Sequence, residues 1–319
     1  MKLFLDFETR SVADLKKTGT WRYAEDPSTD VLCLAYAFDD KPVVLWPKWR
    51  YQDESAEIAS DCFELKQAVL SGAELHAHNA FFERAIWENI MVKKYGWPPV
   101  KHKQWRCTAA RAAALALPRS LESCANALGL PIRKDQAGKR VMMKLCKPKW
   151  DKDGEFYTWH ENPDDLQTLY KYCMNDVEVE RALDTRLKEL SENELKVWQL
   201  DQKINERGIL VDTTLVEKAK KVIEVYTTDL TFELQTITNG EVETATQRDR
   251  MIAWLNKNSG EFKTLTKADV KDALKVKTLY KDLRRVLEIR QELSKTSTAK
   301  YKAITDAVCS DGRLRDLLM

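Results

Sequence analysis

Two acidic residues near the start of the chain have the spacing of a metal-binding pair. Asp6 and Glu8 follow the apolar run Leu3-Phe4-Leu5, which predicts a strand. Residues two apart on a strand point to the same face, so their carboxylates would lie side by side. The two charges repel each other, and a divalent cation that prefers oxygen ligands, such as Mg²⁺, would compensate them. A D-x-E pair alone is equally typical of a chance acidic strand end.

Two later motifs place further reactive groups on helices. Asn79 follows the short predicted strand 74–77 and suits an N-cap, which puts Glu83 about one turn into the next helix. Tyr172 precedes Asp176 by four residues, so the phenol and the carboxylate would share one helix face. Each motif by itself is also typical of ordinary structure, namely a capped surface helix and a common side-chain pair.

Strand-like and helix-like segments alternate through the first half of the chain, which predicts a mixed α/β domain with helices covering its sheet. The expected strands are 2–7, 31–38, 43–46 and 74–77. The expected helices are 64–71, 80–93, 108–116, 120–129, 138–146 and a long one beginning at Asn162-Pro163-Asp164-Asp165 and running to about Leu190. Between the last two helices, residues 147–162 form a polar, aromatic-bearing loop or short hairpin.

The pattern becomes almost wholly helical after Ser191. Helices are predicted over 191–207, 213–238, 246–258, 266–275 and 279–308. We therefore expect two domains, residues 1–190 and residues 191–319, although no Pro/Gly-rich linker marks the boundary.

Overall charge indicates no partner, because 52 Lys and Arg against 50 Asp and Glu leave only +2. Local charge is more informative: residues 263–302 hold twelve basic and five acidic residues, a net +7. Seven scattered cysteines without a C-x-x-C pair indicate reduced thiols in a cytosolic protein. With no signal peptide and no membrane-length apolar run, we expect a cytoplasmic protein without a membrane partner.

In their order along the chain, the three acidic motifs resemble the proofreading 3′→5′ exonuclease family that uses four acids and a tyrosine. The resemblance covers roughly residues 1–190 and implies an RNase H-like fold. Neighbouring residues, including Asp14-Leu15-Lys16 and Arg22-Tyr23-Ala24, are similar to the phage type of family A DNA polymerase. A phage-encoded protein of this type would act in the cytoplasm of its host.

The resemblance implies a role for each acid. The motifs would supply the ligands of two Mg²⁺ or Mn²⁺ ions, with Asp6 bridging both and with Tyr172 and Glu8 orienting the attacking water. Glu83 departs from the wider family, which usually has Asp there, and its extra methylene could reach or shift the second metal. The implied catalytic set is Asp6, Glu8, Glu83, Tyr172 and Asp176, the implied metal ligands are the four acids, and Thr9 and Asn79 are expected to contact the single-stranded 3′ end of DNA.

The basic segment in the second half resembles the thumb of family A polymerases, as do Arg207-Gly208-Ile209-Leu210-Val211-Asp212 and Asp311-Gly312-Arg313. Cations interleaved with hydroxyls suit phosphate contacts, although a solvated helix face has the same composition. The residues expected to face duplex DNA are Arg290, Lys295, Thr296 and Lys300.

Polymerase motifs of the palm and fingers do not occur: D-x-S-x-[IL]-E, R-x₃-K-x₆-Y-G and H-D-E are all absent, and the chain reaches Met319 about where a palm would begin. We therefore expect a 3′→5′ DNA exonuclease without a polymerase active site, as the N-terminal part or a subunit of a family A polymerase. A separate palm and fingers subunit would then be a partner. Two alternatives are a free-standing 3′→5′ nuclease on RNA or DNA and a non-catalytic module that tethers DNA to a polymerase.

Overall fold

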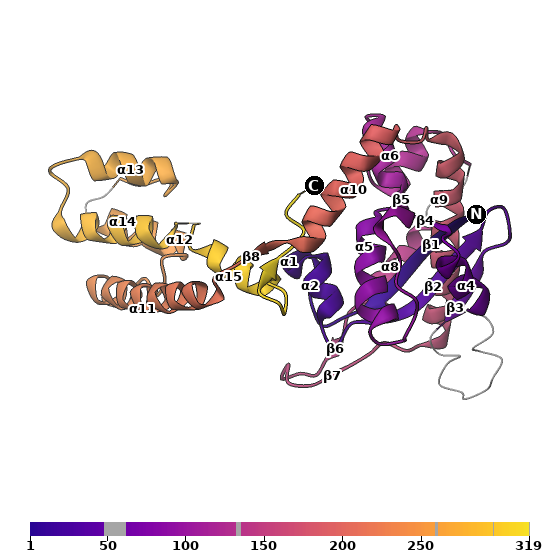
Figure 1. Cartoon of the computed structure of the whole chain (residues 1–319). Helices are drawn as coiled ribbons and strands as arrows, with labels where there is room; N and C mark the ends of the chain where they lie inside the picture. The colour runs from indigo at the N-terminus through magenta and orange to yellow at the C-terminus, as the bar shows by residue number, and fades with distance from the viewer. Residues whose placement is uncertain (48–61, 132–134, 259–260, 296, 319) are drawn as a thin grey trace. The chain divides into compact units, whose positions relative to one another are not determined.

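Five strands form a mixed sheet in the first part of the chain (Figure 1). The computed structural model describes residues 1–47, 62–131, 135–258, 261–295 and 297–318. The strand order is β3-β2-β1-β4-β5; β1 pairs antiparallel with β2 and parallel with β4, β2 is antiparallel to β3, and β4 is parallel to β5. The strands are β1 (Lys2–Arg10), β2 (Asp30–Phe38), β3 (Val44–Pro47), β4 (Glu74–Ala77) and β5 (Trp105–Cys107). This order, with helices packed around it, is the expected RNase H-like α/β fold.

Strand β1 lies at the centre of the sheet and contributes to a core on each face. Its odd-numbered residues Leu3, Leu5 and Phe7 belong to a large cluster with α5 (Ala80–Ile86) and its neighbours. Phe4, from the opposite face, belongs to a second cluster with residues of α8 and α9. Alternation along the strand therefore places Asp6 on the face covered by α9.

The remaining helices of this part connect and cover the strands. They are α1 (Leu15–Thr18), α2 (Thr20–Glu25), α4 (Phe63–Leu70), a π-helical segment η2 (Trp87–Val92), a short turn η3 (His102–Gln104), α6 (Thr108–Ala114), α7 (Leu121–Ala127), α8 (Gln136–Leu145), α9 (Pro163–Arg186) and α10 (Glu192–Arg207). Helix α9 begins as predicted, because the Asn162 side chain accepts hydrogen bonds from the Asp164 and Asp165 amides at 2.9 and 3.1 Å. No helix among the described residues is both long and apolar enough to span a bilayer.

A second, smaller part of the chain is helical and has its own core. It contains α11 (Thr213–Ile237), α12 (Arg248–Lys257), α13 (Lys267–Lys275), α14 (Lys281–Leu293) and most of α15 (Ala299–Ala307). Leu234, Met251 and Leu287 are fully buried members of its hydrophobic cluster. The predicted helix 279–308 is wrong as a single element, since it breaks between α14 and α15. Ser294 and Thr298 hydroxyls there donate to the Gln291 and Lys295 carbonyls, which competes with helical bonding.

The division into two compact units differs from the predicted boundary near residue 190. One unit comprises residues 1–211 and 307–319, and the other comprises residues 212–306. The end of the chain belongs to the first unit because β9 (Arg313–Leu314) pairs with β8 (Ile209–Leu210). The sequence did not predict this strand pair. Gly208 precedes this pair at φ +63°, and a Cβ there would lie 2.6 Å from the Leu314 carbonyl oxygen. Strand β5 was likewise not predicted, because three residues carry too little periodicity.

Candidate metal centre

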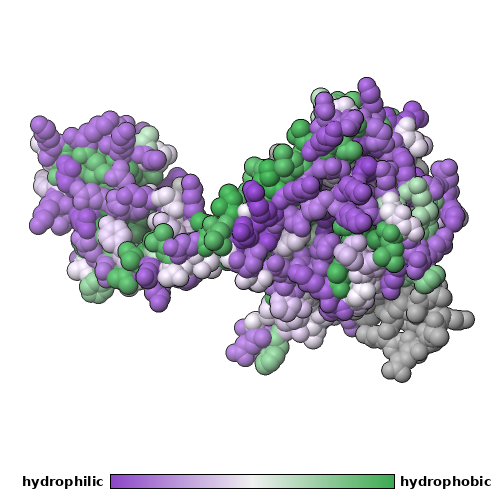
Figure 2. Space-filling model, in the orientation of Figure 1, coloured by the Kyte–Doolittle hydropathy of each residue, from purple (hydrophilic) through white to green (hydrophobic). Residues whose placement is uncertain are grey.

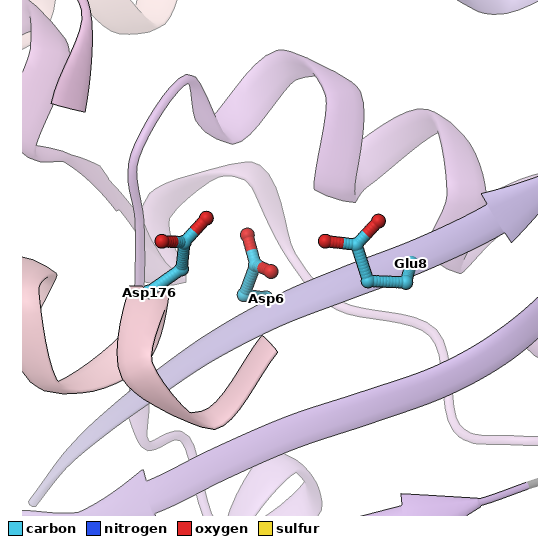
Figure 3. Close-up of side chains that lie close together, drawn as sticks. All are labelled: Asp6, Glu8 and Asp176. Atoms are coloured by element: carbon cyan, nitrogen blue, oxygen red, sulfur yellow. The ribbon is translucent and has the colours of Figure 1, made fainter. Parts of the chain in front are cut away.

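Three carboxylates meet where β1 passes α9. Asp6, Glu8 and Asp176 each offer one oxygen, and these atoms all lie within 4.8 Å of one another. Figure 3 shows Asp6 between the other two, with Asp6 and Glu8 projecting from the strand and Asp176 from a helix beside it. Asp6 is half-buried, whereas Glu8 and Asp176 are buried. The fold therefore brings Asp6 and Asp176, which are 170 positions apart in the sequence, to one point.

Local packing explains why the strand and helix meet with these acids facing each other. Cys173 and Val177 of α9 are fully buried in the cluster that also contains Phe4 of β1. The Cys173 thiol donates to the Asp6 carbonyl oxygen at 3.3 Å, which fixes the helix close to the strand. Asp176, between these two apolar positions, consequently lies over the strand face that carries Asp6.

The donor set fits a hard divalent cation. Mg²⁺ and Mn²⁺ prefer oxygen ligands, and all three groups of the cluster are carboxylates. Three like charges in a buried site repel each other strongly unless a cation compensates them. Asp6, Glu8 and Asp176 are the residues that would hold such an ion.

Tyr172 lies one turn before Asp176 on α9, as the spacing predicts, and its side chain is only 2% exposed. Burial raises the pKa of the phenol, and the charges of Asp176, Glu8 and Asp6 raise it further, as does a hydrogen bond with Asp176. The phenol therefore remains protonated and can donate a hydrogen bond. Helix α8 approaches this side chain closely at Gly138, where a Cβ would lie 2.7 Å from Tyr172 Cβ.

Glu83 lies outside the three-residue cluster, but its carboxyl group interacts electrostatically with Asp6. Its side chain on α5 is 4% exposed, and its Oε2 atom is buried without a hydrogen-bond partner among the described residues. Burial raises the pKa of this carboxyl group well above its usual range, and the charge of Asp6 raises it further. A buried acid with an unsatisfied oxygen beside Asp6 is suited to a second cation.

Glu180 is an acid of the site that the sequence analysis missed. It lies one turn after Asp176 on α9, is buried, and has a pKa raised well above its usual range by burial and by the charge of Asp6. The Thr108 hydroxyl donates to Glu180 Oε1 at 3.2 Å, and His78 Nδ1 lies 2.9 Å from the same hydroxyl. The signal in the sequence is the i, i+4 spacing from Asp176, which extends the Tyr172–Asp176 face by one more turn.

The expected DNA contacts of the first half differ in accessibility. Thr9 is buried and its hydroxyl lies 2.9 Å from the Tyr23 hydroxyl, so it faces the interior. Asn79 is exposed and lines a cavity of about 730 Å³ together with Phe81 and Arg119. The Asn79 side chain does not cap α5, contrary to prediction, because the residue adopts a left-handed conformation with φ 75°. That conformation differs from the extended one in which capping side chains reach the helix amides.

The expected duplex contacts lie in the helical unit. The Arg290 guanidinium donates to the Ala245 carbonyl at 2.7 Å and is partly buried, so it is held by the protein. Lys295 is exposed and pairs with Glu292 at 2.5 Å, and Lys300 is exposed. Thr296 lies outside the described residues.

Comparisons with known proteins agree with a polymerase relationship. No protein-family model matches the chain. A DNA polymerase of Bacillus phage SP02 is 35% identical over 323 residues, a match that covers 99% of this chain and 48% of the phage protein. The chain thus spans about half the length of this curated relative.

A solved structure shares the fold over both units. The POL domain of Pol1 from M. smegmatis, solved with DNA primer-template and dNTP, superposes with a TM-score of 0.51 and 14% identity. The match covers 97% of this chain and 48% of that one. At this identity the likeness concerns the fold alone.

Proposed function

We propose that this chain is a two-metal-ion 3′→5′ DNA exonuclease that proofreads for a family A DNA polymerase, as its N-terminal part or as a subunit. The observation that carries the proposal is the cluster of Asp6, Glu8 and Asp176 with Tyr172 one turn from Asp176. Similarity to a phage DNA polymerase over nearly the whole chain supports DNA as the substrate class.

Each residue would perform a distinct part of the hydrolysis. Divalent ions held by these carboxylates supply charge that stabilises the entering and leaving oxygens of a phosphodiester displacement. Tyr172 keeps its proton and donates a hydrogen bond that orients the attacking water, while Glu8 accepts from that water. Asn79, exposed in the lining of the cavity beside α5, is available to the terminal nucleotide.

The test is cleavage of a 5′-labelled single DNA strand in Mg²⁺. We expect a ladder of products shortened from the 3′ end, abolished by EDTA. The double variant Asp6→Ala/Glu8→Ala should lose at least about 10³-fold in rate, because two ligands of the ion are removed. A matched control, Asp40→Ala/Glu192→Ala, removes two exposed acids outside the acidic cluster and should cleave normally.

Several outcomes would contradict the proposal. Undiminished activity in the Asp6→Ala/Glu8→Ala protein would show that these two acids take no part in the cleavage. Equal or faster cleavage of RNA would favour the free-standing nuclease. Tight DNA binding without any cleavage by the wild type would favour the tethering module.

A further inference from the structure

A short hairpin between α8 and α9 presents aromatic side chains to solvent. Its strands are β6 (Lys149–Trp150) and β7 (Tyr157–Thr158), and it projects from the first unit (Figures 1 and 2). Trp150, Phe156 and Tyr157 are 47%, 72% and 41% exposed. Large aromatic side chains usually gain stability by burial, so a group of them left in water indicates a binding surface.

The aromatic rings of the hairpin contact one another in a row. The Trp150 and Tyr157 ring centroids are 5.3 Å apart, and those of Tyr157 and Trp159 are 5.4 Å apart. The row ends at Arg10, whose guanidinium carbon lies 4.7 Å from the Trp159 ring centroid. These contacts hold the rings in place without covering their outer surfaces.

Both ends of the hairpin are attached to the strand that carries the acids. The Ser11 amide donates to the Cys146 carbonyl at 3.1 Å just before the hairpin, and Arg10 pairs with Glu161 at 3.0 Å just after it. Arg10 lies two residues beyond Glu8, a distance of about 7 Å along a strand. The aromatic row therefore begins at a residue of β1 that is two positions along the chain from the candidate metal centre.

The stem of the hairpin carries two lysines suited to a phosphate backbone, whereas in the turn Lys152 is balanced by acids. Lys147 and Lys149 are exposed at the stem, and Lys152 follows in the turn. Among the acids in the turn, the Asp151 side chain accepts a hydrogen bond from the Glu155 amide at 2.9 Å, which stabilises the turn. Cations beside exposed rings are the combination that binds unpaired strands, because every base has a face that can stack.

We propose that the hairpin of residues 147–160 is a stacking platform for the bases of an unpaired strand whose 3′ end enters the acidic centre. That the 3′ end of the strand enters the acidic centre rests on the proposed function, while binding of the strand to the hairpin requires no cleavage. The platform would hold the strand without reading its sequence, as a proofreading site requires.

The experiment compares affinities of the full chain for a labelled strand of about twelve thymidines, in EDTA so that no cleavage occurs. Trp150→Ala/Tyr157→Ala should weaken binding by about 5- to 150-fold for each base that loses its ring. Trp150→Phe/Tyr157→Phe should retain most of the affinity, because phenylalanine still stacks. Phe63→Ala removes a still more exposed aromatic on α4; it is the matched control and should leave affinity unchanged.

An abasic strand of the same length separates stacking from charge. It should bind the wild type and the alanine double variant alike, since it keeps the phosphates but has no base to stack. Equal affinity of wild type and double variant for the thymidine strand would overturn the platform. A loss as large in Phe63→Ala would also overturn it. If the strand binds through the hairpin but is never cleaved, the proposed function fails and the platform stands.

Discussion

Glu83 has one methylene more than the aspartate usual at its position in the resembling family, and its buried carboxylate lies near Asp6. If it binds a second cation, Glu83→Ala should lower Mg²⁺ affinity by on the order of 100-fold, because a direct ligand is lost. Glu83→Asp keeps the charge with a shorter reach and should retain substantial activity. Single-turnover cleavage across a Mg²⁺ titration measures both effects. A fully active Glu83→Ala protein would mean that another group binds the second ion or that one ion suffices.

Glu180 should make stability depend on pH in the absence of metal. Its pKa is raised in the folded state, so the folded protein binds more protons than the unfolded chain, and stability falls as pH rises from the usual glutamate pKa toward the raised value. Glu180→Gln keeps an acceptor for Thr108 and removes the charge. It should therefore stabilise the protein at pH 8, with the difference shrinking toward pH 4.

Urea unfolding in EDTA at several pH values measures this difference. Glu178→Gln is the control, because Glu178 lies on the same helix but is partly exposed and pairs with Arg181. A constant difference between Glu180→Gln and the wild type across the pH range would show that the carboxyl group is not the cause.

Helix α9 depends on a buried ion-pair network at its C-terminal end for its position. Arg111 of α6 pairs with Asp184 and donates to the Leu187 carbonyl, and Lys2 contacts Asp184 at 2.7 Å. Burial opposes the charge on Asp184, but hydrogen bonds from His76 and Lys2 and the charge of Arg111 lower the pKa of the carboxyl group overall. The network joins α9 to β1 and α6, and so it holds the helix that carries Tyr172 and Asp176.

Arg111→Ala should accordingly destabilise the protein by about 3–5 kcal/mol, since a buried carboxylate loses its main partner. Lys196→Ala removes an exposed i, i+4 pair with Glu192 and should change stability by about 0–1 kcal/mol. Chemical unfolding of both variants at neutral pH provides the measurement. A loss in Arg111→Ala no greater than that of the surface variant would contradict the structural role of the network.

At the scale of the whole molecule, the helical unit is expected to bind duplex phosphates. Exposed Lys295 and Lys300 are the test residues, and their neutralisation should flatten log affinity against log salt by about one unit per lost contact. The loss should be uniform across template sequences, because phosphate contacts read no bases. Cleavage of short single strands should not change.

Binding of a labelled primer-template at several salt concentrations measures the slope for Lys295→Gln/Lys300→Gln. Lys218→Gln/Lys257→Gln removes two other exposed lysines of the same unit and is the matched control. Superimposed curves for the wild type and Lys295→Gln/Lys300→Gln would leave a solvated helix face as the better description of this segment.

The sequence by itself determined most of the longer elements of this protein and the local pairings within them. The D-x-E pair on a strand and Tyr172 one turn before Asp176 follow from backbone geometry alone, since strands repeat every two residues and helices every 3.6. The start of α9 was equally readable, because its cap, proline and acids are adjacent in the chain. The mixed α/β fold followed from the alternation of these elements.

Tertiary structure decided which distant residues meet. The i, i+4 spacing places Glu180 on the same helix face as Asp176, but its closeness to Asp6 arises only when α9 packs on β1. The same holds for the unit boundary: residues 307–318 rejoin the first unit because β9 pairs with β8, about a hundred residues earlier. The sequence showed that residues 147–162 are rich in aromatic side chains. Only the contact of Arg10 with the Trp159 ring and the hydrogen bond from the Ser11 amide to the Cys146 carbonyl place this hairpin beside the acids. Contacts between residues far apart in sequence depend on how whole elements pack, and no local periodicity records that packing.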